Sequence, residues 1–185
     1  IGLIGGTDYG YSQYNRATNA KRQPGSTVKP FLYYKAIEKG FTSTTKFLSN
    51  KTTFNFDNNQ TYSPKNYGNI YAGKEITLAT ALAYSDNIFA VKTHLFLGQD
   101  ELVNNLKKVG ITSDIKELPS TPLGTFETSP KELATAYATL SNEGKKVKPH
   151  IIEKIEDING NVLYEYKEKE EQILDPAITF IISEL

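Results

Sequence analysis

The sequence has no cysteine, no methionine and no tryptophan, and its only histidines are His94 and His150. Without cysteine there is no thiol nucleophile, no disulfide and no thiolate zinc site. Two histidines are too few for a histidine-rich metal cluster, so we predict neither a metal site nor a cofactor. A chain that opens at Ile1 and contains no methionine is expected to be a piece of a longer protein.

An excess of charge of one sign is also lacking, because 21 Lys and Arg residues balance 21 Asp and Glu residues. The usual electrostatic basis for binding nucleic acid or an anionic membrane is therefore absent, and we predict no nucleic-acid partner. No apolar run reaches the roughly 18 residues that a membrane-spanning helix needs. The 185 residues, 38% of them hydrophobic, are enough for one folded domain with a single core.

Apolar residues recur at helical spacing in several segments that begin or end at capping residues. One predicted helix begins at Ser26 and stops at Gly40. The clearest spans 129–144, where Ser129 and Glu132 form a capping box. The other predicted helices are 76–84, 88–98, 100–109 and a last one that opens at Asp175.

Strand signals are fewer and lie toward the two ends of the chain. Residues 1–6 are predicted to form a short buried strand that ends in glycines. Residues 42–75 are rich in Thr, Asn and Tyr and are predicted to be extended or looping chain. Two strand-like runs, 150–155 and 162–166, flank Asn159-Gly160, which is typical of a hairpin turn. The predicted fold class is α+β.

One motif could carry covalent chemistry. In Ser26-Thr27-Val28-Lys29, a helical turn places serine and lysine about 5–6 Å apart on one face. A serine hydroxyl needs an adjacent base to become a good nucleophile, and a lysine amine can serve only if its pKa falls from about 10.4. Two further Ser-x-x-Lys sequences occur, where composition alone would give about one in all. They are Ser43/Lys46 and Ser113/Lys116.

Context separates the three motifs, since only Ser26 opens a long apolar-periodic helix behind a Pro-Gly turn. The alternative role for Ser26 is that of a plain helix-capping serine. Ser85-Asp86-Asn87 is a second polar group, between two predicted helices. Its side chains could project into a cleft, but these residue types are also the commonest caps and turn formers.

A family resemblance rests on segments spread over nearly the whole chain in the same order. The segment from Arg22 to Phe31 closely resembles the active-site serine segment of class A (bifunctional) penicillin-binding proteins. The similarity continues in Gly5–Tyr9, Asn15–Ala17, Thr77–Leu82, Ser85–Lys92, Pro122–Gly124, Ser129–Ala134 and Ile155–Glu165.

The resemblance implies a penicillin-binding transpeptidase (serine β-lactamase-like) fold, present as its helical part and parts of the antiparallel sheet. It implies a peptidoglycan D,D-transpeptidase that cross-links stem peptides ending in D-Ala-D-Ala and is the target of β-lactams. Ser26 would be the nucleophile and Lys29 its base. Ser85 would relay a proton to the leaving group, and Asn87 would bind the substrate amide and orient Lys29.

One family feature is missing. No Lys-Thr-Gly or Lys-Ser-Gly occurs, and Lys92-Thr93-His94 lacks the glycine and lies in a helical pattern. Residues 1–185 are therefore expected to be a partial transpeptidase domain with little activity of its own. The family's upstream glycosyltransferase domain and membrane anchor are absent from the chain as well.

The expected partners are stem peptides, β-lactams and other cell-wall synthesis proteins, with membrane contact only through the upstream anchor. The expected location is the extracytoplasmic face of the bacterial membrane. Three alternatives remain open: a D,D-carboxypeptidase or β-lactamase, in which water replaces the acceptor amine; a scaffold domain that kept the fold without the chemistry; and a helical adaptor with chance motifs.

Overall fold

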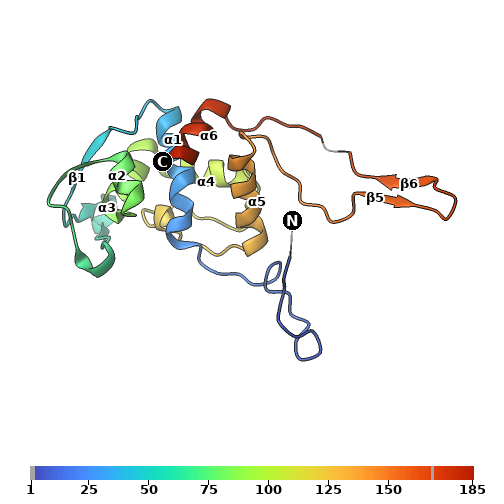
Figure 1. The fold of residues 1–185 in the computed structure, drawn as a ribbon. Coiled ribbons are helices and arrows are strands. Elements are labelled where there is room, and N and C mark those ends of the chain that lie inside the picture. The colour runs from blue at the N-terminus through green and yellow to red at the C-terminus, as the bar shows by residue number, and fades with distance from the viewer. Residues whose placement is uncertain (1–2, 168) are drawn as a thin grey trace.

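The computed structural model describes residues 3–167 and 169–185, and Figure 1 shows helices gathered into a body from which two segments project. One projection is the N-terminal segment, and the other is the hairpin formed by residues 154–165. The helices are α1 (Lys29–Glu38), α2 (Leu78–Ala83), α3 (Asn87–Leu97), α4 (Gln99–Lys108), α5 (Pro130–Ser141) and α6 (Pro176–Glu184). Short 3-10 turns occupy Gly25–Val28, Asp57–Asn59, Tyr67–Asn69 and Thr121–Leu123.

Helix α1 lies at the centre of the body and contacts α2, α3, α4 and α6. Apolar residues occur all round it, as expected of a core helix. Each fully buried apolar side chain contributes about 1.5–3 kcal/mol relative to exposure, so this helix anchors the residues at its N-terminal end. Its buried apolar residues are Phe31, Leu32, Tyr33, Tyr34 and Ala36.

The strands form three separate antiparallel pairs. β1 (Lys46–Ser49) pairs with β4 (Lys74–Thr77), with Phe47 opposite Ile76. β2 (Phe54–Asn55) pairs with β3 (Thr61–Tyr62), and β5 (Lys154–Glu156) pairs with β6 (Val162–Glu165) in the projecting hairpin. β1 packs against α3 and β4 against α2. The chain between these two strands reaches the site described below.

The structure confirms the α+β class, the predicted helices and the hairpin around Asn159-Gly160. The early strand is wrong: residues 3–6 form no strand, and Ile4 is 84% exposed. Residues 1–2 of that prediction lie outside the described residues. A strand needs a partner for its N–H and C=O groups, and within 3–167 and 169–185 no strand pairs with residues 3–6.

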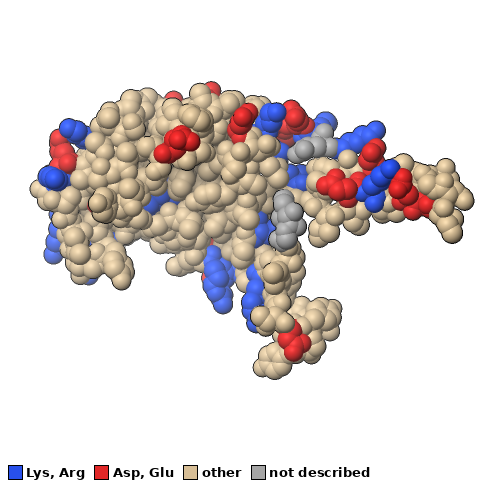
Figure 2. Space-filling view, viewed as in Figure 1, with Lys and Arg blue, Asp and Glu red and all other residues tan. Residues whose placement is uncertain are grey.

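Charges of both signs are interspersed over the face shown in Figure 2, including the projecting hairpin. Among the described residues, none of the helices has the length and the apolar run needed to cross a bilayer.

Candidate active site

Ser26 lies in the 3-10 turn Gly25–Val28 that leads directly into α1, and its side chain is exposed. The turn is held by α5, because the Tyr137 hydroxyl donates to the Thr27 carbonyl oxygen at 2.7 Å. Gly124 approaches so closely that a Cβ there would lie 2.2 Å from the Gly25 carbonyl oxygen. The Ser26 side chain is thus exposed to solvent, while these contacts hold the backbone of its turn in place.

Lys29, the first residue of α1, is buried to 1% exposure. Its Nζ donates to the Ser85 carbonyl oxygen at 2.6 Å, to Ser85 Oγ at 3.0 Å and to Asn87 Oδ1 at 2.7 Å. Burial lowers the pKa of Lys29 to about 8, although the negative charge of Asp86 acts in the opposite direction. All three protons of the Lys29 ammonium group are donated to neutral oxygens. Among the described residues, no carboxylate is hydrogen-bonded to this amine, so none opposes the loss of its proton.

Ser85, Asp86 and Asn87 form the turn that separates α2 from α3. Ser85 has a φ of +54°, a left-handed conformation that costs about 1–3 kcal/mol for a residue with a Cβ. Asp86 is the N-cap of α3 and accepts from the Phe89 N–H at 2.7 Å. Capping and site formation therefore coexist, because Asp86 caps α3 while Ser85 and Asn87, on either side of it, both accept from Lys29 Nζ.

The buried Asp86 carboxylate has further donors that the sequence did not reveal. Ser49 Oγ donates to it at 2.5 Å, and the Asn66 side-chain amide donates at 2.7 Å. The Asn87 amide nitrogen donates to the Lys65 carbonyl oxygen at 2.7 Å, which leaves Asn87 Oδ1 for Lys29. Ser49 and Asn66 belong to a strand and a loop far from Asp86 in sequence, so no local spacing could have identified them.

The structure brings Lys29, Ser85 and Asn87 into direct contact and places Ser26 one turn before Lys29. The Ser26 carbonyl oxygen accepts the Lys29 backbone N–H. In the described part of the chain, the Ser26 hydroxyl itself makes no hydrogen bond. The predicted hydrogen bond between the Lys29 amine and the Ser26 hydroxyl therefore requires a state in which Lys29 Nζ has broken one of its three present hydrogen bonds.

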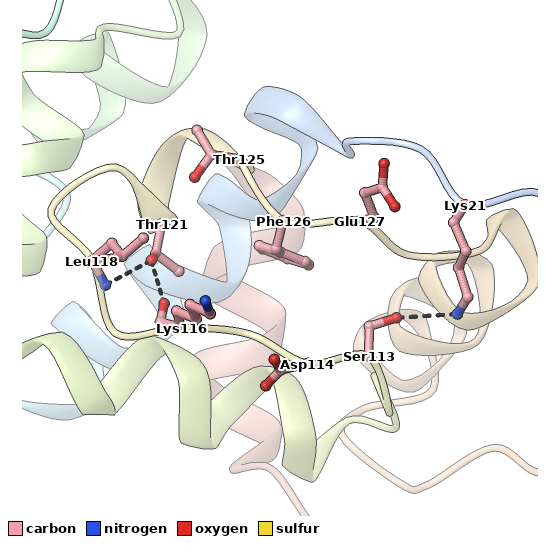
Figure 3. A pocket seen from close by; sticks show the side chains of 9 residues that line it. All are labelled: Lys21, Ser113, Asp114, Lys116, Leu118, Thr121, Thr125, Phe126 and Glu127. Atoms are coloured by element: carbon pink, nitrogen blue, oxygen red, sulfur yellow. Dashed lines mark hydrogen bonds between the residues drawn. The ribbon is translucent and has the colours of Figure 1, made fainter.

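The other two Ser-x-x-Lys motifs are built differently. Ser113 and Lys116 both line a cavity of about 470 Å³, drawn in Figure 3, but the Ser113 hydroxyl is paired with Lys21 Nζ at 3.1 Å. The Lys116 carbonyl oxygen is bound by Thr121 at another part of the cavity wall. In the third motif, Lys46 begins strand β1 and Ser43 precedes it in a loop. Neither of these motifs lies at the start of a helix.

Across residues 3–167 and 169–185, no three acidic or histidine side chains are grouped so as to hold a metal ion. His94 is fully buried in α3, where its Nε2 lies 3.1 Å from the Leu118 carbonyl oxygen.

The sequence matches the Transpeptidase family, described as the penicillin binding protein transpeptidase domain, over residues 5–179. It is 50% identical to penicillin-binding protein 2D of Bacillus subtilis over all of this chain and 27% of that protein. It is 40% identical to penicillin-binding protein 1A of Aquifex aeolicus over 93% of this chain and 24% of that protein. The chain thus spans about a quarter of the length of these relatives.

Solved structures give the same assignment. Penicillin-binding protein 1A from Haemophilus influenzae superimposes with a TM-score of 0.85 at 28% identity, over 97% of this chain and 31% of that one. The imipenem acyl-enzyme complex of penicillin-binding protein A from M. tuberculosis shares the fold, with a TM-score of 0.80 at 21% identity over 92% of this chain and 44% of that one. With nearly the whole chain matched in sequence and in fold, this chain belongs to the penicillin-binding protein transpeptidase domain family.

Proposed function

We propose that this chain carries the nucleophile and base of a peptidoglycan D,D-transpeptidase that works through an acyl-enzyme on Ser26. One observation carries the proposal: Lys29 is buried, bound only by neutral oxygens of Ser85 and Asn87, and one turn from an exposed serine. A lysine with a lowered pKa beside a serine is the arrangement that activates a hydroxyl.

In the proposed acylation step, Ser26 Oγ attacks the carbonyl carbon between the two terminal D-alanines of a stem peptide. The hydroxyl proton passes to the neutral amine of Lys29. The C–N bond breaks, and a proton delivered through the Ser85 hydroxyl leaves with the terminal D-alanine as its amine. Asn87 binds the substrate amide and keeps Lys29 in place.

In the second step, an amine from a neighbouring stem peptide attacks the ester carbonyl. The new amide forms, the ester C–O bond breaks, and the proton lost by the amine returns to Ser26 Oγ through Lys29. A β-lactam would enter by the same attack, since opening its ring leaves an ester on Ser26. The imipenem acyl-enzyme complex of penicillin-binding protein A from M. tuberculosis, which shares the fold, supports this chemistry.

We further propose that residues 1–185 are one part of the transpeptidase domain of a longer, membrane-anchored protein, acting at the extracytoplasmic face on stem peptides beside other cell-wall proteins. The chain contains no Lys-Thr-Gly or Lys-Ser-Gly, the third motif of the family. In the family, the strand that carries this motif supplies a second oxyanion donor and the contact for the substrate carboxylate. The 185-residue chain alone is thus expected to show little D-alanine release.

The test is the intact mass of the full-length protein after treatment with benzylpenicillin, with Ser26→Ala and Ser113→Ala alongside. We expect one adduct in the wild type and in Ser113→Ala, and none in Ser26→Ala. An adduct that persists in Ser26→Ala would overturn the assignment of the nucleophile. No adduct on a folded wild-type protein would favour the scaffold alternative. Release of D-alanine with water as the only acceptor would favour a D,D-carboxypeptidase.

A further inference from the structure

The Ser85–Asp86–Asn87 turn is braced by one side chain from a distant loop. Asn66 precedes the 3-10 turn Tyr67–Asn69 in the long connection between β1 and β4. Its Nδ2 donates to Asp86 Oδ2 at 2.7 Å, while its Oδ1 accepts the Asn87 backbone N–H at 2.8 Å. A single amide therefore joins the side chain of one residue of the turn to the backbone of the next.

The same loop makes a second contact, because the Lys65 carbonyl oxygen accepts from Asn87 Nδ2 at 2.7 Å. That bond fixes which end of the Asn87 amide faces Lys29. Ser85, beside it, is held in a left-handed conformation that a residue with a Cβ adopts only when its surroundings impose it. The loop that carries Lys65 and Asn66 supplies part of that constraint.

We propose that Asn66 is a positioning residue for the acylation step, bridging Asp86 and Asn87 so that Ser85 and Asn87 hold the Lys29 amine where Ser26 needs a base. The inference rests on the proposed function of Ser26 and Lys29. Asn66 contacts neither substrate nor the reacting atoms in this scheme, and it acts through the turn.

The charges around Asp86 determine the sign of the expected effects. Lys29 and Lys92 both sense its negative charge, and the buried Tyr33 hydroxyl also lies within its field. Lys92 Nζ itself donates to the Leu48 carbonyl oxygen at 2.6 Å. Removing the Asn66 amide takes away a donor to Asp86, so the carboxylate would stabilise the Lys29 ammonium more strongly. Replacing Asp86 by asparagine would have the opposite effect.

The experiment measures acylation of the full-length protein by a fluorescent penicillin between pH 6 and pH 10. Rates are normalised to the amount of Ser26 that can be labelled on long incubation, so unfolded protein does not contribute. For Asn66→Ala we expect a fall of about ten- to a hundredfold in the normalised rate. We also expect the midpoint of the pH profile to rise by about 0.5–1 unit, and that of Asp86→Asn to fall.

The matched control is Asn104→Ala, which removes an asparagine that also donates to a carboxylate, on the exposed surface of α4. Asn66→Ser, which keeps a short polar side chain but cannot bridge both Asp86 and Asn87, is the milder variant to use if the alanine variant does not fold. A fall in the normalised rate is expected for it as well. A merely structural role would lower the melting temperature and the labelled fraction while the normalised rate and the midpoint stay those of the wild type. That result would overturn the inference. Failure of the wild type to acylate, in contrast, would overturn the proposed function itself.

Discussion

Two clusters in this domain each pair a lysine amine with a serine hydroxyl, and they differ in the other groups that bind the amine. In the first, Lys29 is 1% exposed and donates only to neutral oxygens of Ser85 and Asn87. In the second, the Lys21 side chain is 45% exposed and donates both to Ser113 Oγ and to the Glu132 carboxylate, the latter at 2.9 Å. Both clusters place a lysine amine at a serine hydroxyl.

The two clusters differ in whether a carboxylate is hydrogen-bonded to the lysine amine. A carboxylate at hydrogen-bond distance stabilises an ammonium, whereas burial among neutral acceptors favours loss of its proton. Burial alone would raise the pKa of Glu132, but hydrogen bonds from Thr112, Lys21 and Ser129 hold it well below its usual range. The second cluster is thus a clasp that ties the N-terminal segment and the loop after α4 to the start of α5. Only the first is suited to act as a base.

The largest expected effect comes from replacing each of the two lysines by methionine. Lys29→Met keeps much of the buried side-chain volume but removes the proposed base, so penicillin acylation of the full-length protein should fall by about 10²–10⁴-fold. Lys21→Met should leave the acylation rate within about threefold of the wild type, because its amine serves the clasp. Equal losses in the two variants would break the distinction between the clusters. The measurement is the second-order rate constant for labelling by a fluorescent penicillin.

The pH dependence of acylation tests the same distinction. Since the pKa of Lys29 is lowered to about 8, its neutral fraction falls with each pH unit below that value. The acylation rate should therefore fall about tenfold per unit below pH 8 and level off above it. Lys29 should also make the free energy of unfolding rise between about pH 8 and pH 10.4, because the unfolded chain binds more protons there. A flat acylation profile from pH 6 to pH 9 would contradict the assignment of Lys29 as the base.

The clasp itself should matter for stability rather than for acylation. Glu132→Gln removes the charge that Lys21 and the Thr112 N–H meet. We expect it to lower the free energy of unfolding by about 1–3 kcal/mol at pH 7. Because the pKa of Glu132 is lowered by folding, this stabilisation is complete above about pH 5 and is lost as the pH falls further. Denaturant unfolding at pH 7 and pH 3 measures the difference, and the acylation rate should stay within about twofold.

More of the helices could be predicted from the sequence than of the contacts that hold the candidate site in place. The capping box at Ser129 and Glu132 was predicted and is present, because caps are local patterns of a few residues. The same glutamate also receives Lys21 and Thr112, and no local pattern contains those partners. In the same way, Ser85 and Asn87 could be proposed from the family resemblance. The contacts that Asn66 and Lys65 make with their turn come from a distant segment and are visible only in the folded chain.

The smallest expected effect tests how firmly the backbone of the proposed nucleophile is held. The Tyr137 hydroxyl donates to the Thr27 carbonyl oxygen at 2.7 Å, and its ring packs edge-on against Phe31. Tyr137→Phe keeps the ring contact and removes one hydrogen bond, so we expect a loss of about 1 kcal/mol in unfolding free energy. Because Thr27 follows Ser26, the acylation rate should fall by about two- to fivefold.

Tyr166→Phe is the matched control for that variant, since it removes a hydroxyl that donates to the Lys148 carbonyl oxygen at 3.5 Å beside the projecting hairpin. Its acylation rate should equal that of the wild type. If Tyr137→Phe loses stability but acylates at the wild-type rate, the 3-10 turn is held well enough by the Gly25–Gly124 approach alone. The exposed serine would then depend on α5 only for folding. A fall in rate larger than that of Lys29→Met would instead make the turn, and not the buried amine, the main determinant of acylation.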